Sequence, residues 1–165
     1  MKLTFKEVAT MAASVAVIVF VGIYVLQDDV IVAKHVWFYD LNTGELFVAD
    51  GQAVAPIAAP SDRGGKESGV LAQVIRIEGE DELRVVFLQS FTPEAKVSRI
   101  AYLRNKDDKD ANNGTIDAGL LVAAPPLKPG EPITWFALRS PEGAAVLMRI
   151  SSLTGPRTYQ ACLPP

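Results

Sequence analysis

The sequence has few of the residues that build metal centres and nucleophilic sites. It contains one cysteine, Cys162, and one histidine, His35. A single cysteine cannot form an intrachain disulfide or a cysteine metal cluster, and a single histidine cannot supply the common zinc ligand sets. No Gly-x-Ser-x-Gly nucleophile elbow accompanies the histidine. The sequence therefore predicts a protein that is not an enzyme, with no catalytic, cofactor-binding or metal-binding residues and no small-molecule substrate.

Positive charge is also scarce. The 165 residues include 16 Lys and Arg against 19 Asp and Glu, which gives a formal net charge of −3. A chain without a basic excess has little electrostatic attraction for a phosphate backbone, so nucleic acid is not an expected partner. The length suits one domain with a modest hydrophobic core.

The longest run without charge lies near the start of the chain. Val8–Leu26 holds 19 residues and no charged side chain. A helix rises about 1.5 Å per residue, so this run approaches the roughly 30 Å hydrocarbon core of a bilayer. Lys2 and Lys6 precede it, whereas Asp28 and Asp29 follow it, which predicts a cytoplasmic N-terminus. We expect a single-pass cell-membrane protein with an extracytoplasmic (periplasmic) C-terminal domain and the lipid bilayer as one partner.

This interpretation divides the chain into four parts. They are a cytoplasmic N-terminus at residues 1–7, a transmembrane helix at 8–27, a juxtamembrane linker at 28–35 and an extracytoplasmic α+β domain at 36–165. The expected fold class is α+β: a single N-terminal transmembrane helix followed by a small domain with an antiparallel sheet and two helices.

Two alternatives compete for the same segment. A cleaved signal peptide has a hydrophobic region of about 7–15 residues and a small-x-small cleavage site. This run is longer, and Ile31-Val32-Ala33 places a bulky residue at the wrong position. The second alternative is a type IV pilin-like start, because Leu3-Thr4-Phe5-Lys6-Glu7 resembles the pilin pattern, although Lys2 stands where that family has a glycine. A pilin-like or pseudopilin subunit of a filament or secretion system is therefore the alternative function.

Branched and aromatic residues between turn signals predict the strands of the domain. Asn42-Thr43-Gly44 is typical of a three-residue hairpin connection, in which Gly44 adopts a left-handed conformation at little cost. The predicted strands cover residues 36–41, 45–50, 69–77, 83–91, 120–124 and 133–138, and a loop covers 53–69.

Two helix starts share one pattern. Thr92-Pro93-Glu94 and Ser140-Pro141-Glu142 each offer an N-cap, a proline at the first helical position and an acidic first turn. The first helix is predicted to run to about Asn105 and the second to stop at Gly155-Pro156. A strand over 144–151 competes with the second helix, but these cap and stop signals favour the helix. The predicted inward faces are Val97, Ile100, Ala101 and Leu103 or Arg104 in the first helix, and Val146, Leu147, Ile150 and Leu153 in the second.

Two motifs resemble catalytic or binding signatures in part. Asn42-Thr43-Gly44 resembles the Asp-Thr-Gly signature of aspartic proteases, but an amide cannot share a proton or activate water as a carboxylate does. Asp108-Lys109-Asp110-Ala111-Asn112 has the alternating oxygen ligands of an EF-hand calcium loop. Its sixth and twelfth positions, however, are Asn113 and Gly119 instead of glycine and glutamate. A loose calcium contact at Asp108–Asn112 is left open beside the simpler interpretation of a charged loop.

Aromatic residues gather at the start of the predicted domain. Trp37, Phe38 and Tyr39 are consecutive, and Phe47 lies on the next predicted strand. Side chains alternate between the two faces of a strand, so we expect one face to pack on the core and the other to meet lipid headgroups or a neighbouring protein. The exposed face of Trp37–Val48 is the candidate contact surface. The predicted function is a membrane-anchored, non-enzymatic accessory or structural protein of a bacterial envelope assembly, which acts by contact with a protein partner or larger membrane complex.

Several short motifs occur in an order that is similar to a known set of proteins. They are FYDLNTGELFVA, PIAAPS, GVLAQVIRI, FTPEAK, Trp135, SPEG and the final CLP. Together they resemble uncharacterised small single-pass membrane proteins of planctomycete-type bacteria over most of the chain. Members of that set often carry a CxxC-like segment where this chain has Ile77-Glu78-Gly79-Glu80-Asp81. The resemblance implies the architecture and an envelope location, and it assigns no activity to any residue.

Overall fold

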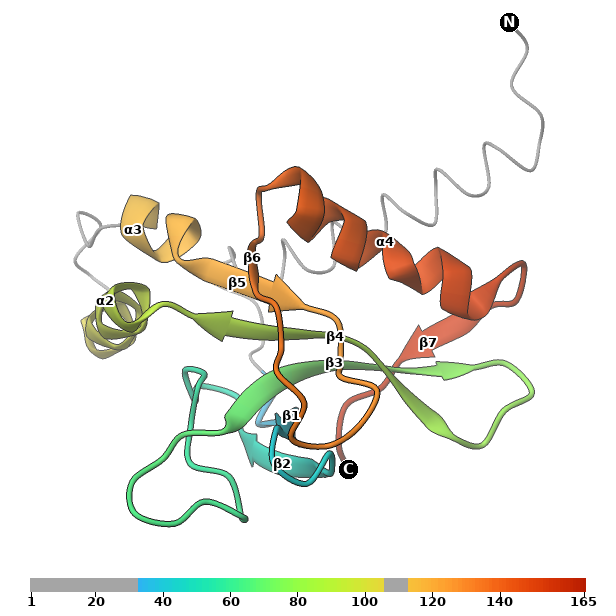
Figure 1. The fold of residues 1–165 in the computed structure, drawn as a ribbon, viewed down its shortest axis with the longest axis horizontal. Helices are drawn as coiled ribbons and strands as arrows, with labels where there is room; N and C mark the ends of the chain where they lie inside the picture. The colour runs from blue at the N-terminus through green and yellow to red at the C-terminus, as the bar shows by residue number, and fades with distance from the viewer. Residues whose placement is uncertain (1–32, 106–112) are drawn as a thin grey trace, which may run out of the picture.

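A seven-stranded antiparallel sheet organises the residues that the structure, a computed structural model, describes: 33–105 and 113–165. The strand order is β2-β1-β3-β4-β5-β6, and β7 pairs with β3 outside this path. Three helices accompany the sheet in these two ranges (Figure 1). The elements in chain order are β1 (His35–Asp40), β2 (Leu46–Asp50), β3 (Gly69–Ile77), β4 (Leu83–Phe91), α2 (Pro93–Arg104), α3 (Asn113–Ala118), β5 (Leu120–Ala123), β6 (Phe136–Ala137), α4 (Pro141–Thr154) and β7 (Tyr159–Ala161).

The predicted first hairpin is confirmed. β1 and β2 pair in antiparallel register, with Phe38 opposite Phe47. The backbone N–H of Gly44 donates to the carbonyl of Asp40 at 2.8 Å, and Gly44 has a φ of 77°. This left-handed conformation is open to glycine at little cost, which is why the turn ends on this residue. The predicted bounds of β3 and β4 are also confirmed.

Both predicted helix starts are confirmed. The hydroxyl of Thr92 accepts a hydrogen bond from the backbone N–H of Ala95, and the hydroxyl of Ser140 accepts one from Gly143. Each pair satisfies one of the N–H groups that a helix leaves free in its first turn.

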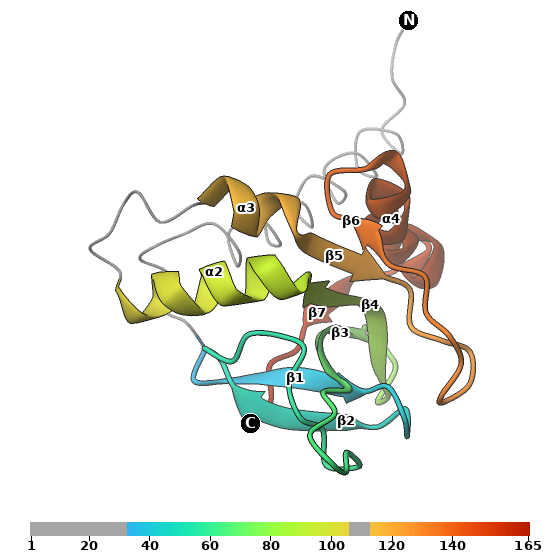
Figure 2. The same cartoon turned by 60° about the vertical axis from the view of Figure 1, so that its left-hand side comes forward.

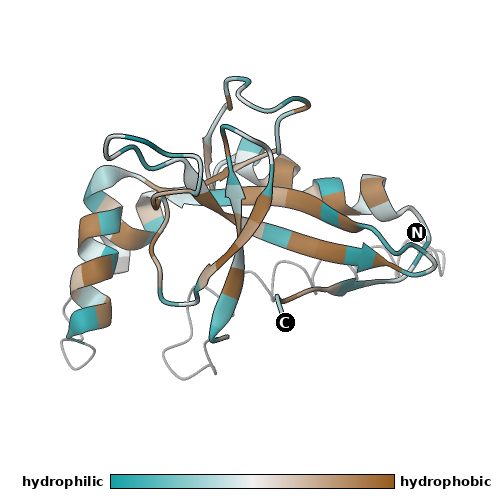
Figure 3. Cartoon of the chain, turned by 90° about the horizontal axis from the view of Figure 1, so that it is seen from below, coloured by the Kyte–Doolittle hydropathy of each residue, from teal (hydrophilic) through white to brown (hydrophobic). Residues whose placement is uncertain are grey.

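The core lies on both faces of the sheet. On one face α4 buries Val146, Leu147 and Ile150 against β3, β4 and β5. These residues belong to the inward face that the sequence predicts for this helix. On the other, Ile133 and Trp135 pack over a cluster around Val74 and Leu88. In Figure 2 α2 and α3 lie next to each other at one end of the sheet. Figure 3 shows mainly hydrophobic colour along the strands, whereas several of the surrounding loops are hydrophilic.

The first and last strands share one edge of β3. Leu71 of β3 pairs with both Phe38 of β1 and Gln89 of β4, and Ile75 pairs with both Ala161 of β7 and Arg84 of β4. Since β4 occupies one edge of β3 along this length, β1 and β7 must both occupy the opposite edge. They meet it at different ends, which leaves a notch between them.

The predicted fold class is wrong in the described part of the chain. That part has three helices, not two, and none of them is long and apolar enough to cross a membrane. The sequence did not predict the helix α3 or the strand β7. α3 packs against α2, with Ile116 buried, and β7 pairs with β3. The transmembrane helix predicted at residues 8–27 lies outside the described residues, as do most of the linker at 28–35 and the pilin-like start at Leu3–Glu7.

Two finer predictions also need correction. The strand predicted at 133–138 is reduced to Phe136–Ala137, because Ile133 and Trp135 pack over the sheet instead of pairing in it. The predicted inward face of α2 is wrong as well: its buried residues are Ala95 and Tyr102, and Val97 is 68% exposed. The reason is that α2 packs mainly on α3 and only lightly on the sheet.

Candidate functional site

The four aromatic residues predicted to meet a partner lie on both faces of the first hairpin. Phe38 is fully buried beside Ala55, and its ring centroid lies 5.7 Å from that of Phe47. Tyr39 is buried on the opposite face, where this burial and then the charge of Asp40 raise the pKa of its phenol. Phe38 and Tyr39 therefore belong to the core. Trp37 and Phe47 are only half-buried, and the contact prediction is narrowed to them and their neighbours on β2.

β2 forms one margin of the sheet, with β1 as its one neighbour among the described strands. Two backbone bonds fix which residues face β1: Asp40 N–H donates to the Glu45 carbonyl at 2.9 Å, and Gly51 N–H donates to the Lys34 carbonyl at 3.0 Å. Paired residues in an antiparallel ladder alternate between bonded and non-bonded positions. The intervening residues Leu46, Val48 and Asp50 therefore direct their N–H and C=O groups away from β1.

A polar cluster lies beneath the turn of the same hairpin, and we call it the Asp40 cluster: Asp40, Asn42, Ser61, Asp62 and Ser68. The carboxylate of Asp40, only 2% exposed, accepts hydrogen bonds from the Ser61 hydroxyl at 2.8 Å and from the backbone N–H of Asn42 at 2.9 Å. It also accepts longer ones from Thr43 N–H, Ser61 N–H and the Ser68 hydroxyl. Burial raises the pKa of Asp40, but the hydrogen bonds from Ser61, Asn42 and Thr43 outweigh it, so the pKa lies below its usual value.

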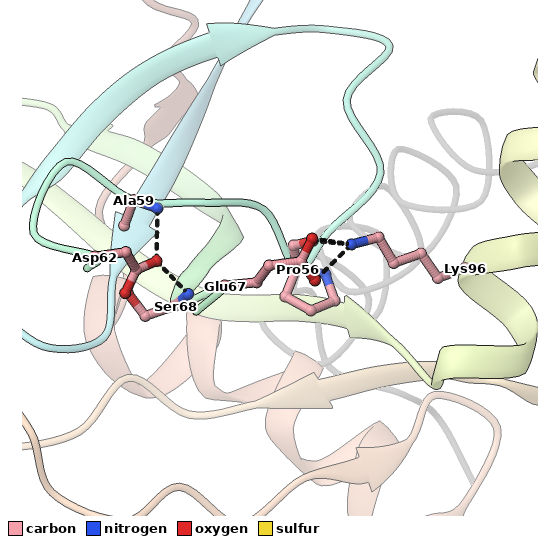
Figure 4. A network of polar contacts seen from close by, with 6 residues as sticks. All are labelled: Pro56, Ala59, Asp62, Glu67, Ser68 and Lys96. Atoms are coloured by element: carbon pink, nitrogen blue, oxygen red, sulfur yellow. Dashed lines mark hydrogen bonds and ion pairs between the residues drawn. The ribbon is translucent and has the colours of Figure 1, made fainter. Parts of the chain in front are cut away.

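Asp62 holds the loop before β3 in a closed shape (Figure 4). Its Oδ2 accepts from the backbone N–H groups of Ala59 at 2.8 Å and Ser68 at 2.7 Å. Its Oδ1 accepts from the Ser68 hydroxyl at 2.7 Å and from Nδ2 of Asn42 at 3.1 Å. The bond from Ala59, followed by the one from Ser68, lowers the pKa of Asp62 to about 2.

A second tie joins this loop to α2. Nζ of Lys96 donates to the backbone carbonyl of Pro56 and pairs with the carboxylate of Glu67 at 2.7 Å, as Figure 4 shows. The loop between β2 and β3 is thus bonded at Asp62 to the hairpin turn and at Glu67 to a helix. The Asp40 cluster therefore has a structural role, because it holds the hairpin turn and the loop before β3 together. Its carboxylates stay charged at neutral pH and accept from several donors at once.

Only part of the Asp40 cluster could have been predicted from the sequence. Asp40 lies two residues before Asn42, the spacing at which an aspartate accepts from its own turn, so its local bonds could have been recognised. The contribution of Ser61, Asp62 and Ser68 depends on the long-range fold and has no local signal.

The acidic turn Glu78–Glu82 is partly engaged in hydrogen bonds and ion pairs. Glu80 pairs with Arg157 and with Arg84, and these hydrogen bonds, that from Arg157 first, lower its pKa. Glu78 accepts from the hydroxyl of Thr158. The turn is therefore joined to the chain just before β7.

The structure limits the metal hypotheses. Within 33–105 and 113–165, no group of three or more His, Cys, Asp or Glu side chains is placed to hold a metal ion. Asp108–Asn112 lies outside the described residues. The sixth to eleventh positions of the proposed calcium loop form α3, whereas an EF-hand loop needs a sharp turn at its sixth position.

The one histidine and the one cysteine of the sequence lie on different strands or beside them. His35 is exposed at the start of β1. Cys162 is a free, half-buried thiol directly after β7. Comparison with protein-family models, with curated proteins and with solved structures finds no match. The resemblance to planctomycete-type membrane proteins stays a prediction.

Proposed function

We propose that this protein acts by protein–protein contact, as a non-enzymatic accessory module that receives an extended segment of a partner protein along β2. The observation that carries the proposal is the row of outward backbone groups at Leu46 and Val48, together with the outward N–H of Asp50, deduced from the two bonds that fix the register of the hairpin. The carbonyl of Asp50 is not part of this row, because it accepts from the N–H of Ala53. A partner strand that pairs with such a row gains main-chain hydrogen bonds, and the side chains along it supply specificity.

The side chains of β2 support this use. Leu46, Phe47, Val48 and Ala49 are four consecutive apolar residues, and Val48 is 46% exposed. Soluble proteins usually guard a sheet edge with charge, proline or a bulge, because an apolar edge pairs with other chains. Charged residues stand only at the margins of this strand, at Glu45 directly before β2 and at Asp50, its last residue. The apolar middle of the strand is therefore suited to a permanent partner.

The expected setting, an envelope assembly, rests on the charge and hydropathy of residues 2–29 and remains a proposal.

The hairpin that carries β2 is rigidly supported, because the Asp40 cluster fixes the turn that joins β1 to β2. A fixed edge loses little conformational freedom when it binds, which favours affinity.

The test uses a photoreactive amino acid at Asp50, an exposed residue of β2, in the full chain expressed in its own host. Met148, 56% exposed on α4, is the matched control position. We expect a discrete covalent adduct from position 50 and none of the same mass from position 148. The adduct is then identified by mass spectrometry.

A second substitution decides whether the backbone of β2 makes the contact. Val48→Pro removes one outward N–H and should abolish the adduct from position 50, whereas Val48→Thr keeps that N–H and a similar shape and should preserve it. An adduct that persists in Val48→Pro, or that forms equally from position 148, contradicts the proposal.

A further inference from the structure

The outer edge of β2 is complementary to a second copy of itself. Leu46 and Val48 direct their backbone N–H and C=O groups away from β1, the one neighbour of β2 among the described strands. In an antiparallel pair, two residues that face each other in a bonded position exchange both of these groups. A strand with such a row can therefore pair with an identical strand about a two-fold axis, as the surfaces of a symmetric dimer do.

The backbone selects one register for this pairing. With Phe47 on the two-fold axis, Leu46 faces Val48 of the second copy, and every outward group of the two residues has a partner. With Val48 on the axis, Leu46 would face Asp50, whose carbonyl is already bonded to the loop that follows β2. With Leu46 on the axis, Val48 would face Gly44, whose N–H is already bonded within the hairpin turn.

The side chains of β2 fit the same register. Phe47 lies opposite Phe47 of the second copy on one face of the joined sheet, and Leu46 lies opposite Val48 on the other, since side chains alternate along a strand. Aromatic and branched cross-strand pairs of this kind stabilise a sheet. The apolar middle of β2 is thus covered by the apolar middle of its copy.

The acidic residues at the margins of β2 also avoid each other. In this register Glu45 lies opposite Ala49 of the second copy, and Asp50 lies opposite Gly44. Like charges directly opposite each other destabilise a strand pair, and here each carboxylate faces a small uncharged residue. We infer that the partner of β2 is a second copy of this chain, so that two sheets join across an antiparallel β2–β2 contact. This inference rests on the proposed use of β2 as a docking edge and names its partner.

Engineered cysteines test the register in the full chain, because its one native cysteine can be replaced. In the inferred dimer, positions 45 and 49 of the two copies form a non-bonded pair with Cα atoms about 4.5 Å apart, within reach of a disulfide. Glu45→Cys and Ala49→Cys chains, each with Cys162→Ser, should form a linked dimer when they are co-expressed and mildly oxidised. Either variant expressed alone is the matched control, since its two cysteines lie roughly 13 Å apart along the strands.

Analytical ultracentrifugation of the full chain in detergent measures the dimer itself. Val48→Pro removes from each copy an N–H that the pairing uses. It should raise the dissociation constant of the dimer by about ten- to hundredfold, the range that two net hydrogen bonds supply. Val48→Thr keeps that N–H and should weaken the dimer far less. The photoreactive residue at position 50 should give an adduct of twice the mass of the chain.

The failure of this inference can be told from the failure of the proposed function. A chain that stays monomeric, while position 50 yields an adduct with a different protein, overturns the inference and leaves the proposed function standing. The absence of both the dimer and any adduct overturns the two together. A disulfide that forms as readily from Glu45→Cys or Ala49→Cys alone as from the co-expressed pair overturns the register, and with it the inferred contact.

Discussion

Asn42 donates a hydrogen bond from its side-chain Nδ2 to Oδ1 of Asp62, 3.1 Å away and 20 residues further along the chain. The same nitrogen lies 2.9 Å from the hydroxyls of Ser61 and Ser68. One amide thus connects a hairpin turn to a loop that reaches the next strand. The amide that distinguishes this turn from an Asp-Thr-Gly signature is therefore the donor that joins the two segments.

Substitution of Asn42 should reveal the need for a donor at this position. Asn42→Ala removes these bonds and should lower the free energy of unfolding by about 1–2 kcal/mol. Asn42→Asp should cost more at pH 7, because it places a third carboxylate beside Asp40 and Asp62. Urea unfolding followed by tryptophan fluorescence measures both. An Asn42→Asp variant as stable as the unmodified protein at pH 7 contradicts the assigned contacts.

The lowered pKa of Asp62 predicts a dependence of stability on pH. The folded pKa of about 2 lies below the unfolded value near 3.9, so the unfolded chain binds the proton first as the pH falls. The stability that this carboxylate contributes is therefore complete above about pH 4 and is lost as the pH falls toward 2. The gap in unfolding free energy between the unmodified protein and Asp62→Asn should narrow over this window. Asp81→Asn, in an exposed turn, controls for the change in net charge, and a gap that stays constant from pH 5 to about pH 2 would contradict the assignment.

Gly143 explains the glycine of the SPEG motif. A Cβ at this position would lie 2.2 Å from the carbonyl oxygen of Ala137 and 2.9 Å from that of Leu138. Helix propensity alone favours alanine over glycine by about 1 kcal/mol, yet Gly143→Ala should destabilise the protein by about 1–3 kcal/mol, because backbone must move. Thermal unfolding followed by circular dichroism measures the change. The exposed neighbour, Ala144→Gly, should lose only about 1 kcal/mol, and a stabilising Gly143→Ala would contradict the close approach.

Two prolines distinguish the inner and outer edges of β2. Val48→Pro removes an N–H that points away from β1, so its effect on stability should stay within about 1 kcal/mol. Ala49→Pro removes an N–H of the β1–β2 ladder, opposite Val36, and should cost at least about 2 kcal/mol more. Urea unfolding of both variants is sufficient. Equal losses would mean that the register of the hairpin is not the one described.

Local signals in the sequence predicted the elements that local chemistry determines. β3 and β4 are long runs of branched and aromatic residues around an acidic turn, and their predicted bounds match the structure. The two Pro-containing helix starts likewise act within four residues of the cap. By contrast, α3 has the sequence NGTIDA, which has weak helix propensity and gains its helix from packing on α2. β7 is three residues long and exists only as a partner of β3.

The candidate sites depend even more on the fold. Consecutive aromatics at Trp37, Phe38 and Tyr39 correctly mark a strand, but they do not say that both faces of it would be covered. Phe38 and Tyr39 are buried for that reason, and the exposed part of the hairpin is its outer strand.

The shared edge of β3 has a consequence for biosynthesis. β3 pairs with β1 through Leu71 and with β7 through Ile75, and β7 is synthesised after every other described strand. Until then one backbone edge of Ile75–Ile77, a stretch whose two isoleucines are buried in the finished fold, has no partner strand. A chaperone that shields this edge until β7 pairs with it would favour the native pairing over premature association.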